Sequence, residues 1–163
     1  VLYDGKVEGS KFVDEDQFLL EKAISSYCFP SFTYHVYQIP LENGRSVLVY
    51  HVFESVDKPH FVQLDTEPNP VCYVRVKDRT IQASKEMKQI LRRENEDGLT
   101  FAYGEHERWL MEFLRTNEQI TLTEFALQCK LPTWLASRKL VLLVLSRVLK
   151  IEPGENQDHY SLR

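Results

Sequence analysis

The last third of the chain, residues 105–163, carries a succession of elements that few folds accommodate. Its first segment, residues 105–117, predicts a helix because apolar residues recur there at three- and four-residue spacing. These residues are Trp109, Leu110, Phe113 and Leu114. Thr121 and Glu124 then stand at the spacing of a capping box, in which each side chain satisfies a free backbone amide of the other residue. This spacing predicts a short second helix.

A turn, a third helix and a hairpin complete this succession. Residues 129–131 turn the chain, and Pro132 suits the start of a helix that we expect to run from about residue 133 to about residue 150. Residues 153–156, Pro-Gly-Glu-Asn, are a strong turn signal before the predicted last strand at 159–162. Three helices followed by one small hairpin predict a winged helix-turn-helix.

The faces of the predicted third helix bear on its function. At 100° per residue its predicted core arc comprises Trp134, Leu140, Val141, Val144, Leu145, Val148 and Leu149. Polar residues on the opposite arc are Lys139, Ser146, Arg147 and Lys150, and they are interrupted by Leu135, Leu142 and Leu143. A helix that reads bases usually presents hydrogen-bonding side chains, whereas exposed leucines more often mark protein contacts. Nucleic-acid binding and a dimer surface therefore both stay open.

Charge and cysteine content narrow the class of protein. The chain has 163 residues and a formal net charge of −4, so any contact with nucleic acid must come from a local patch. Its three cysteines are far apart and form no CxxC pair, which favours reduced thiols in the cytoplasm. The chain begins without Met inside a predicted strand, Val1-Leu2-Tyr3, which suggests a fragment of a longer protein.

The first half of the chain predicts a helix followed by strands. Residues 14–27 form the predicted helix, with Asp14 and Gln17 at N-cap and N3 spacing. Residues 32–39 and 46–54 predict a hairpin, because the Asn-Gly pair between them readily adopts the positive φ angles of a tight turn. A short strand is expected at 61–64. At the start of the chain, Asp4-Gly5-Lys6 predict a turn before the helix.

The most basic part of the chain lies between residues 71 and 94. A strand at 71–76, a turn at 77–79 and a helix capped by Ser84 are predicted there. Residues 75–93 contain seven Lys and Arg and two acids. This excess of positive charge has two interpretations, a solvated charged surface or a patch that contacts phosphates. Residues 94–98 switch the sign of the charge abruptly and are the predicted linker.

Several motifs of the first 93 residues resemble the Schlafen-type Alba-like DNA-binding domain. The motifs are the end of an apolar strand at Ser55, the loop Lys58-Pro59-His60, the strand Tyr73-Val74-Arg75-Val76 and the helix start Ala83-Ser84. This family is often followed by a winged helix. The resemblance implies a small mixed sheet with helices that binds DNA. The acidic motif of the family's nuclease members would lie before Val1, so the resemblance implies binding rather than cleavage.

Other chemistry receives little support from the sequence. His51 and Glu54 would point to opposite faces of a strand, so a metal site with His60 is not expected, and neither is a cofactor. Aromatic residues of the hairpin offer an alternative, a platform on which bases stack. These are Phe32, Tyr34, Tyr37, Tyr50 and Phe53.

The sequence as a whole predicts an α+β protein of two parts, a Schlafen-type Alba-like domain at 1–94 and a linker with a winged helix at 95–163. The predicted function is binding of nucleic acid, with double-stranded DNA favoured, by a cytoplasmic transcriptional regulator. One alternative is a protein-interaction or homodimer module that uses Leu135, Leu142 and Leu143, and another is a fragment of a metal-dependent nuclease. The predicted nucleic-acid contacts are Arg75, Lys77, Arg79, Lys85, Lys88, Arg92, Arg93, Arg138, Lys139, Ser146, Arg147 and Lys150.

Overall fold

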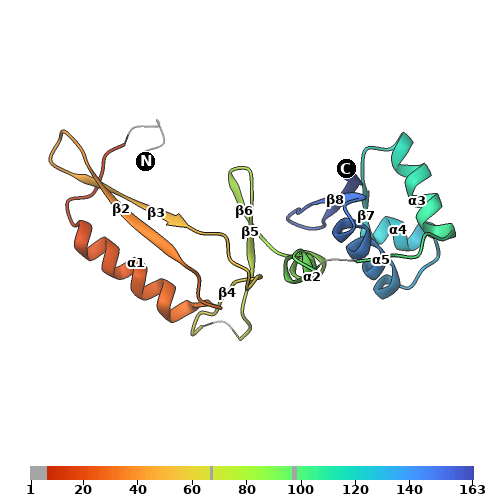
Figure 1. The fold of residues 1–163 in the computed structure, drawn as a ribbon, viewed down its shortest axis with the longest axis horizontal. Helices are drawn as coiled ribbons and strands as arrows, with labels where there is room; N and C mark the ends of the chain where they lie inside the picture. Colours follow the sequence, from red (N-terminus) through yellow and green to blue (C-terminus); the bar gives the residue numbers. More distant parts are fainter. Residues whose placement is uncertain (1–6, 67, 97–98) are drawn as a thin grey trace. The chain divides into compact units, whose positions relative to one another are not determined.

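The protein has a mixed α+β fold, as predicted (Figure 1). The computed structural model describes residues 7–66, 68–96 and 99–163, and within these ranges it contains five helices and several small antiparallel sheets. The chain divides into two compact units, Val1–Pro70 and Val71–Arg163. The predicted first strand and its turn, residues 1–6, lie outside the described residues.

The N-terminal unit is built from one helix and one hairpin. Helix α1 spans Val13–Tyr27, and strands β2 (Tyr34–Pro40) and β3 (Ser46–Val52) pair antiparallel over their full lengths. The predicted hairpin is confirmed, and its turn has Gly44 at a φ of 76° while the Asn43 side chain accepts a hydrogen bond from the amide two residues on. Only Gly44 of the Asn-Gly pair has the predicted positive φ, whereas Asn43 supports the turn through its side chain.

The start of α1 differs from the prediction. Phe12 holds the N-cap position without a side-chain hydrogen bond, so Asp14 lies inside the first turn and does not cap the helix. Its charge still favours the positive end of the helix dipole. Gln17 donates instead to Glu21 at 3.0 Å. Beyond α1, β1 (Cys28–Phe29) pairs with β4 (Phe61–Val62), which is shorter than the strand predicted at 61–64.

Few side chains of the N-terminal unit are buried. Among its described residues only Val13 and Pro59 are buried. Phe12, Phe18 and Leu19 are each more than 60% exposed. The unit therefore gains little from the burial of apolar surface, which is the main force that stabilises a fold.

The C-terminal unit begins with the predicted basic segment. Strands β5 (Tyr73–Val76) and β6 (Arg79–Gln82) form a hairpin whose turn includes Lys77 at a φ of 55°. The second of these strands was not predicted. Helix α2 (Lys85–Arg93) follows, and the predicted cap is confirmed because the Ser84 hydroxyl accepts a hydrogen bond from the Met87 amide at 2.9 Å.

The remaining elements follow the predicted order of three helices and a hairpin, with one unpredicted strand between the first two helices. They are α3 (Glu105–Thr116), β7 (Ile120–Thr121), α4 (Leu122–Gln128), α5 (Thr133–Leu145), β8 (Leu149–Glu152) and β9 (His159–Leu162). The three strands form one antiparallel sheet in the order β7-β9-β8. The predicted capping box is confirmed, since Thr121 and Glu124 each accept a hydrogen bond from the other's backbone amide.

Helix α5 ends five residues earlier than predicted. It stops at Leu145, and Arg147 adopts a φ of 60°. The Val148 amide bonds to the Leu143 carbonyl, and the Arg147 amide bonds to the Val144 carbonyl. This pair of bonds is the Schellman motif, which usually places glycine at the left-handed position. Because Arg occupies that position here, no glycine marks the end of the helix in the sequence.

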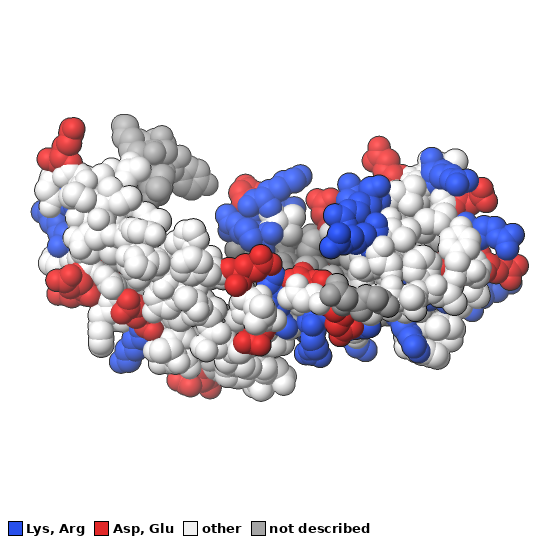
Figure 2. Space-filling view, in the orientation of Figure 1, with Lys and Arg blue, Asp and Glu red and all other residues white. Residues whose placement is uncertain are grey.

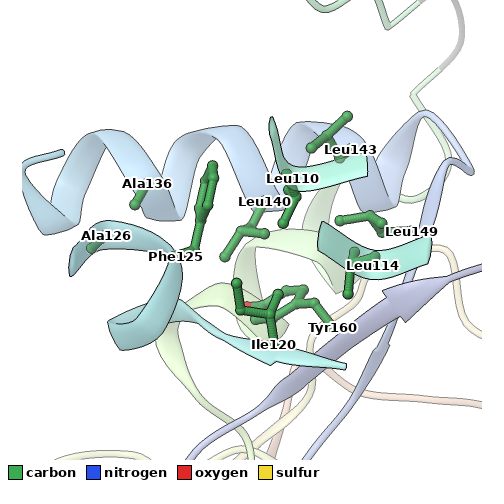
Figure 3. Close-up of a cluster of buried hydrophobic side chains, with 10 residues drawn as sticks. All are labelled: Leu110, Leu114, Ile120, Phe125, Ala126, Ala136, Leu140, Leu143, Leu149 and Tyr160. Atoms are coloured by element: carbon green, nitrogen blue, oxygen red, sulfur yellow. The ribbon is translucent and has the colours of Figure 1, made fainter. Parts of the chain in front are cut away.

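The core of this unit lies between α5, the other C-terminal helices and the three-stranded sheet (Figure 3). Its buried members are Leu110, Leu114, Ile120, Phe125, Ala126, Ala136, Leu140, Leu143, Leu149 and Tyr160. Two predictions about α5 were wrong: Trp134 is 65% exposed, and Leu143 is 1% exposed. The buried arc is centred on Ala136, Leu140 and Leu143, so the proposed leucine surface with Leu135 and Leu142 loses its third member.

The basic segment packs with the C-terminal helices. The boundary between the two compact units therefore falls after Pro70 in the sequence and not at the predicted linker. Helix α2 lies against α5. The Ser137 hydroxyl donates to Glu86 at 2.6 Å, and the Ser84 hydroxyl donates to Asp158. These long-range contacts join residues 71–94 to the unit that follows. Part of the predicted linker, residues 97 and 98, lies outside the described residues.

No helix in the part of the chain that the structure describes combines the length and the apolar character needed to cross a membrane.

Candidate nucleic-acid interface

Helix α2 carries three of the predicted basic residues on one side. Lys85, Lys88 and Arg92 are spaced by three and four residues, so they follow one another along the helix surface. The opposite side holds Ile90, which is buried, and Glu86, which bonds to α5. We call Lys85, Lys88 and Arg92 the basic stripe. Packing of the apolar side against α5 turns the stripe toward solvent.

The basic stripe is electrostatically available. Lys85 and Arg92 are exposed and Lys88 is half-buried. Within the described ranges none of the three forms an ion pair. Figure 2 shows Lys and Arg side chains gathered around α2 and the β5–β6 hairpin, with a few acids among them. Cations that are not engaged in ion pairs remain free to contact phosphate.

In the hairpin β5–β6, Arg75 and Arg79 already form hydrogen bonds or ion pairs. Arg75 donates to the Lys77 carbonyl and to the Thr80 hydroxyl, at 3.2 and 3.0 Å. Arg79 pairs with Glu155 of the β8–β9 loop at 3.3 Å, and both side chains are more than 60% exposed. An exposed pair of this kind contributes little to stability and opens easily. Lys77 is exposed at the turn and forms no ion pair with any described residue, whereas Arg75 and Arg79 already have hydrogen-bond or ion-pair partners.

Arg93 lies on the flank of the basic stripe. Its side chain is 33% exposed and donates to Glu96 at 2.9 Å. Glu96, which lies just beyond the end of α2, therefore neutralises this predicted contact in part.

The five contacts predicted on the third helix are split between elements. Arg138 is exposed on α5, whereas Arg147 lies in the turn after it and Lys150 is exposed on β8. The hydroxyl of Ser146 is buried and has no hydrogen-bond partner among the described residues. The structure thus gathers only Arg138 and Lys139 on the helix itself.

Lys139 is held by a buried carboxylate. Its ammonium group pairs with Glu107 of α3, whose side chain is 3% exposed and which also accepts a hydrogen bond from the Gly104 amide at 2.9 Å. Burial alone would raise the pKa of Glu107, but the bonds from Lys139 and Gly104 hold that pKa below its ordinary value. The carboxylate is thus charged at neutral pH, and Lys139 neutralises it. Sequence reasoning missed this pair because its members are 32 residues apart.

A second buried polar group anchors the start of α2. Asp158 is 9% exposed and accepts hydrogen bonds from the Ser84 hydroxyl and the Gly154 amide. Burial raises the pKa of Asp158, and the hydrogen bond from Ser84 opposes this shift only in part. The neighbouring Tyr160 hydroxyl has no partner among the described residues, and burial together with Asp158 raises its pKa as well. No local pattern in the sequence could reveal this group, because Ser84 and Asp158 are 74 residues apart.

This group makes the stability of the C-terminal unit depend on pH. Since the folded-state pKa of Asp158 is raised, its favourable contribution is complete at acidic pH and is lost as the pH rises through that folded value. We expect Asp158→Asn to remove this loss, so that the variant gains stability relative to the wild type as the pH rises from the ordinary pKa of an aspartate through the raised folded value. Urea unfolding across that range measures the difference. A constant difference between the two proteins would contradict the expectation. Glu86 and His159 are the charged neighbours, and both are kept in the variant.

The residues weighed for other chemistry stay apart. Glu54 pairs with Lys58 at 2.8 Å, and the His60 Nδ1 atom lies 2.7 Å from the Pro30 carbonyl oxygen. Across the described ranges, no group of three or more His, Cys, Asp or Glu is placed to hold a metal ion. Cys28, Cys72 and Cys129 are free thiols.

The predicted aromatic platform is divided between two faces of the hairpin. Tyr34 lies 5.8 Å from Tyr50 and 6.1 Å from Phe32, measured between ring centroids. Tyr37 and Phe53 belong to the opposite face, because successive residues of a strand alternate. The five rings therefore form no single stacking surface.

Comparisons with known proteins add no relative: no protein-family model, no curated protein and no solved structure matches this chain.

Proposed function

We propose that this chain binds nucleic acid, with double-stranded DNA as the favoured ligand, and acts as a transcriptional regulator in the cytoplasm. The observation that carries the proposal is the basic stripe on α2. Three cations without ion-pair partners in the described ranges lie on a helix that is fixed to the C-terminal unit by hydrogen bonds at Ser84 and Glu86. Backbone phosphates are the ligand that such a row of cations fits best.

The arrangement of the C-terminal elements supports the same proposal. We interpret α3, β7, α4, α5, β8 and β9 as a winged helix-turn-helix, in which α5 is the helix expected to approach the major groove. The motifs quoted above for the Schlafen-type Alba-like domain favour DNA as well. Arg138, Arg147 and Lys150 are exposed on or just beyond α5, and Arg138 is the one that its outer side presents.

The mode of binding follows from the side chains available. The exposed side of α5 carries Trp134 and Arg138 but no Asn or Gln, the amides that read adenine. Most contacts would therefore go to phosphates, which position a protein on DNA without specifying a sequence. We propose binding with high salt dependence and modest sequence preference.

A salt titration tests this function. Each phosphate contact lowers the slope of log affinity against log salt by about 0.9, so the basic stripe alone gives a slope of about −2.7 or steeper. Fluorescence anisotropy with a labelled duplex between 50 and 300 mM salt measures the slope. A slope near zero, or no binding at 50 mM salt, would exclude the proposal.

A further inference from the structure

The hairpin β2–β3 has one face that no described element of the N-terminal unit covers. Helix α1 runs along the other face (Figure 1), where Leu20 of the helix lines one cavity together with Leu48 and Tyr50 of β3. Because side chains alternate along each strand, the residues between these point away from α1. We call them the outer sheet face: His35, Tyr37, Ile39, Val47, Val49, His51 and Phe53.

The outer sheet face is apolar, continuous and uncharged. Tyr37, Ile39, Val49 and Phe53 are between 40% and 49% exposed. Tyr37 is paired across the strands with Val49, and His35 is paired with His51. The rings of His35 and Tyr37 lie 4.7 Å apart, and those of His51 and Phe53 lie 4.8 Å apart. No Lys, Arg, Asp or Glu belongs to this face.

The N-terminal unit gains from having this face covered. A two-stranded hairpin is marginally stable by itself in water, and here α1 covers only one side of it. Of the described residues in this unit, only Val13 and Pro59 are buried. A second apolar layer on the outer sheet face would provide the burial that the unit lacks.

The net charge of the N-terminal unit limits which partners could cover the outer sheet face. Residues 1–70 contain 11 Asp and Glu and 5 Lys and Arg, so a polyanion or an anionic lipid surface is repelled. The acids of α1, Asp14, Glu15, Asp16 and Glu21, belong to the helix on the other side of the sheet. An uncharged sheet face can therefore meet a copy of itself without bringing these carboxylates into contact.

We propose that two copies of this chain associate through their outer sheet faces. Two sheets that pack face to face lie about 10 Å apart and interdigitate their side chains. Aromatic side chains bury about 150–250 Å² each, so the exposed fractions correspond to roughly 400–500 Å² per copy. Two copies would bury about 1,000 Å², the lower end for a specific interface, so the dimer is reversible with a Kd of roughly 1–100 µM.

Sedimentation over 1–300 µM protein tests the dimer. The wild type is expected to shift from monomer to dimer in this range. Val49→Lys places a charge at the centre of the outer sheet face, and it is expected to weaken association at least tenfold. Phe53→Ser lies one residue beyond β3, so it removes apolar area with little risk to the strand and should act in the same direction.

Leu19→Lys is the matched control. Leu19 is 63% exposed on α1, away from the outer sheet face, so this variant removes an exposed apolar side chain and should leave the dimer intact. A wild type that stays monomeric at 300 µM would overturn the proposal, as would a dimer that both Val49→Lys and Phe53→Ser leave unchanged. DNA affinity measured on the same monomeric variants separates the two ideas, because the basic stripe on α2 is unaltered in them.

Discussion

Replacement of Lys85, Lys88 and Arg92 together with alanine is expected to weaken the binding of duplex DNA by about 10²- to 10³-fold at 0.1 M salt. Three lost phosphate contacts flatten the slope of log affinity against log salt by about 2.7. If the two proteins bind equally at about 1 M salt, this change in slope gives the stated loss of affinity at 0.1 M. Alanine is the best helix former, so α2 itself should persist. Anisotropy titrations at several salt concentrations measure both quantities.

A matched set of cations elsewhere in the same unit provides the control. Arg108, Arg115 and Lys130 are exposed and lie outside the predicted contacts, so their replacement by alanine changes the net charge equally; Arg115 differs from the stripe in its exposed pair with Glu112. This variant should bind DNA within about threefold of the wild type, since distant charges act only through screened fields. Equal losses in the two variants would mean that net charge, and not the basic stripe, governs affinity.

The second large effect is expected from Lys139→Met. This change leaves Glu107 buried without its cation, and breaking a buried ion pair from one side costs about 3–5 kcal/mol. Urea unfolding monitored by far-UV circular dichroism measures the loss. The exposed neighbour Arg138→Met is the control, with an expected change within about 0.5 kcal/mol.

The double variant Lys139→Met/Glu107→Leu separates charge from packing. Removal of both charges should recover most of the lost stability, because the cost arises from the unpaired carboxylate and not from a missing contact. Acid gives an independent check. The pKa of Glu107 is lowered in the fold, so its contribution is present above its ordinary pKa and is lost as the pH falls through the folded value. If the double variant were as unstable as the single one, the buried pair would not be the cause.

The sequence predicted those elements whose signals are local. Thr121 with Glu124, Ser84 as a cap and the Asn-Gly turn all act within four residues, and each forms the predicted element. The end of α5 could not be predicted in the same way. Its Schellman motif has Arg147 where glycine is usual, so the apolar pattern ran on into β8.

Burial on α5 shows the limit of periodicity. The spacing of apolar residues on α5 defines a wide arc, and periodicity alone does not show which part of it is buried. The position of α3 and the sheet decides that Leu143 is buried while Trp134 is exposed. The compact units divide after Pro70 and not at the charge switch, for a related reason. The charge switch after Glu94 is a local signal, but the packing of α2 on α5 is not.

The candidate site was predictable in part. The spacing of Lys85, Lys88 and Arg92 is a property of the sequence, and it places them on one side of a helix. Which predicted cations are already neutralised depends on partners far along the chain. Glu107 is 32 residues from Lys139, and Glu155 is 76 residues from Arg79. Only the folded chain reveals these pairs.

One hydroxyl group of the C-terminal unit takes part in two hydrogen bonds. Ser84 accepts from the Met87 amide at the start of α2 and donates to Asp158 beside the last strand. The helix therefore cannot come away from the unit without disturbing the bond that begins its first turn. Secondary structure and tertiary attachment are linked through a single oxygen atom, so α2 should form and dock in one cooperative step.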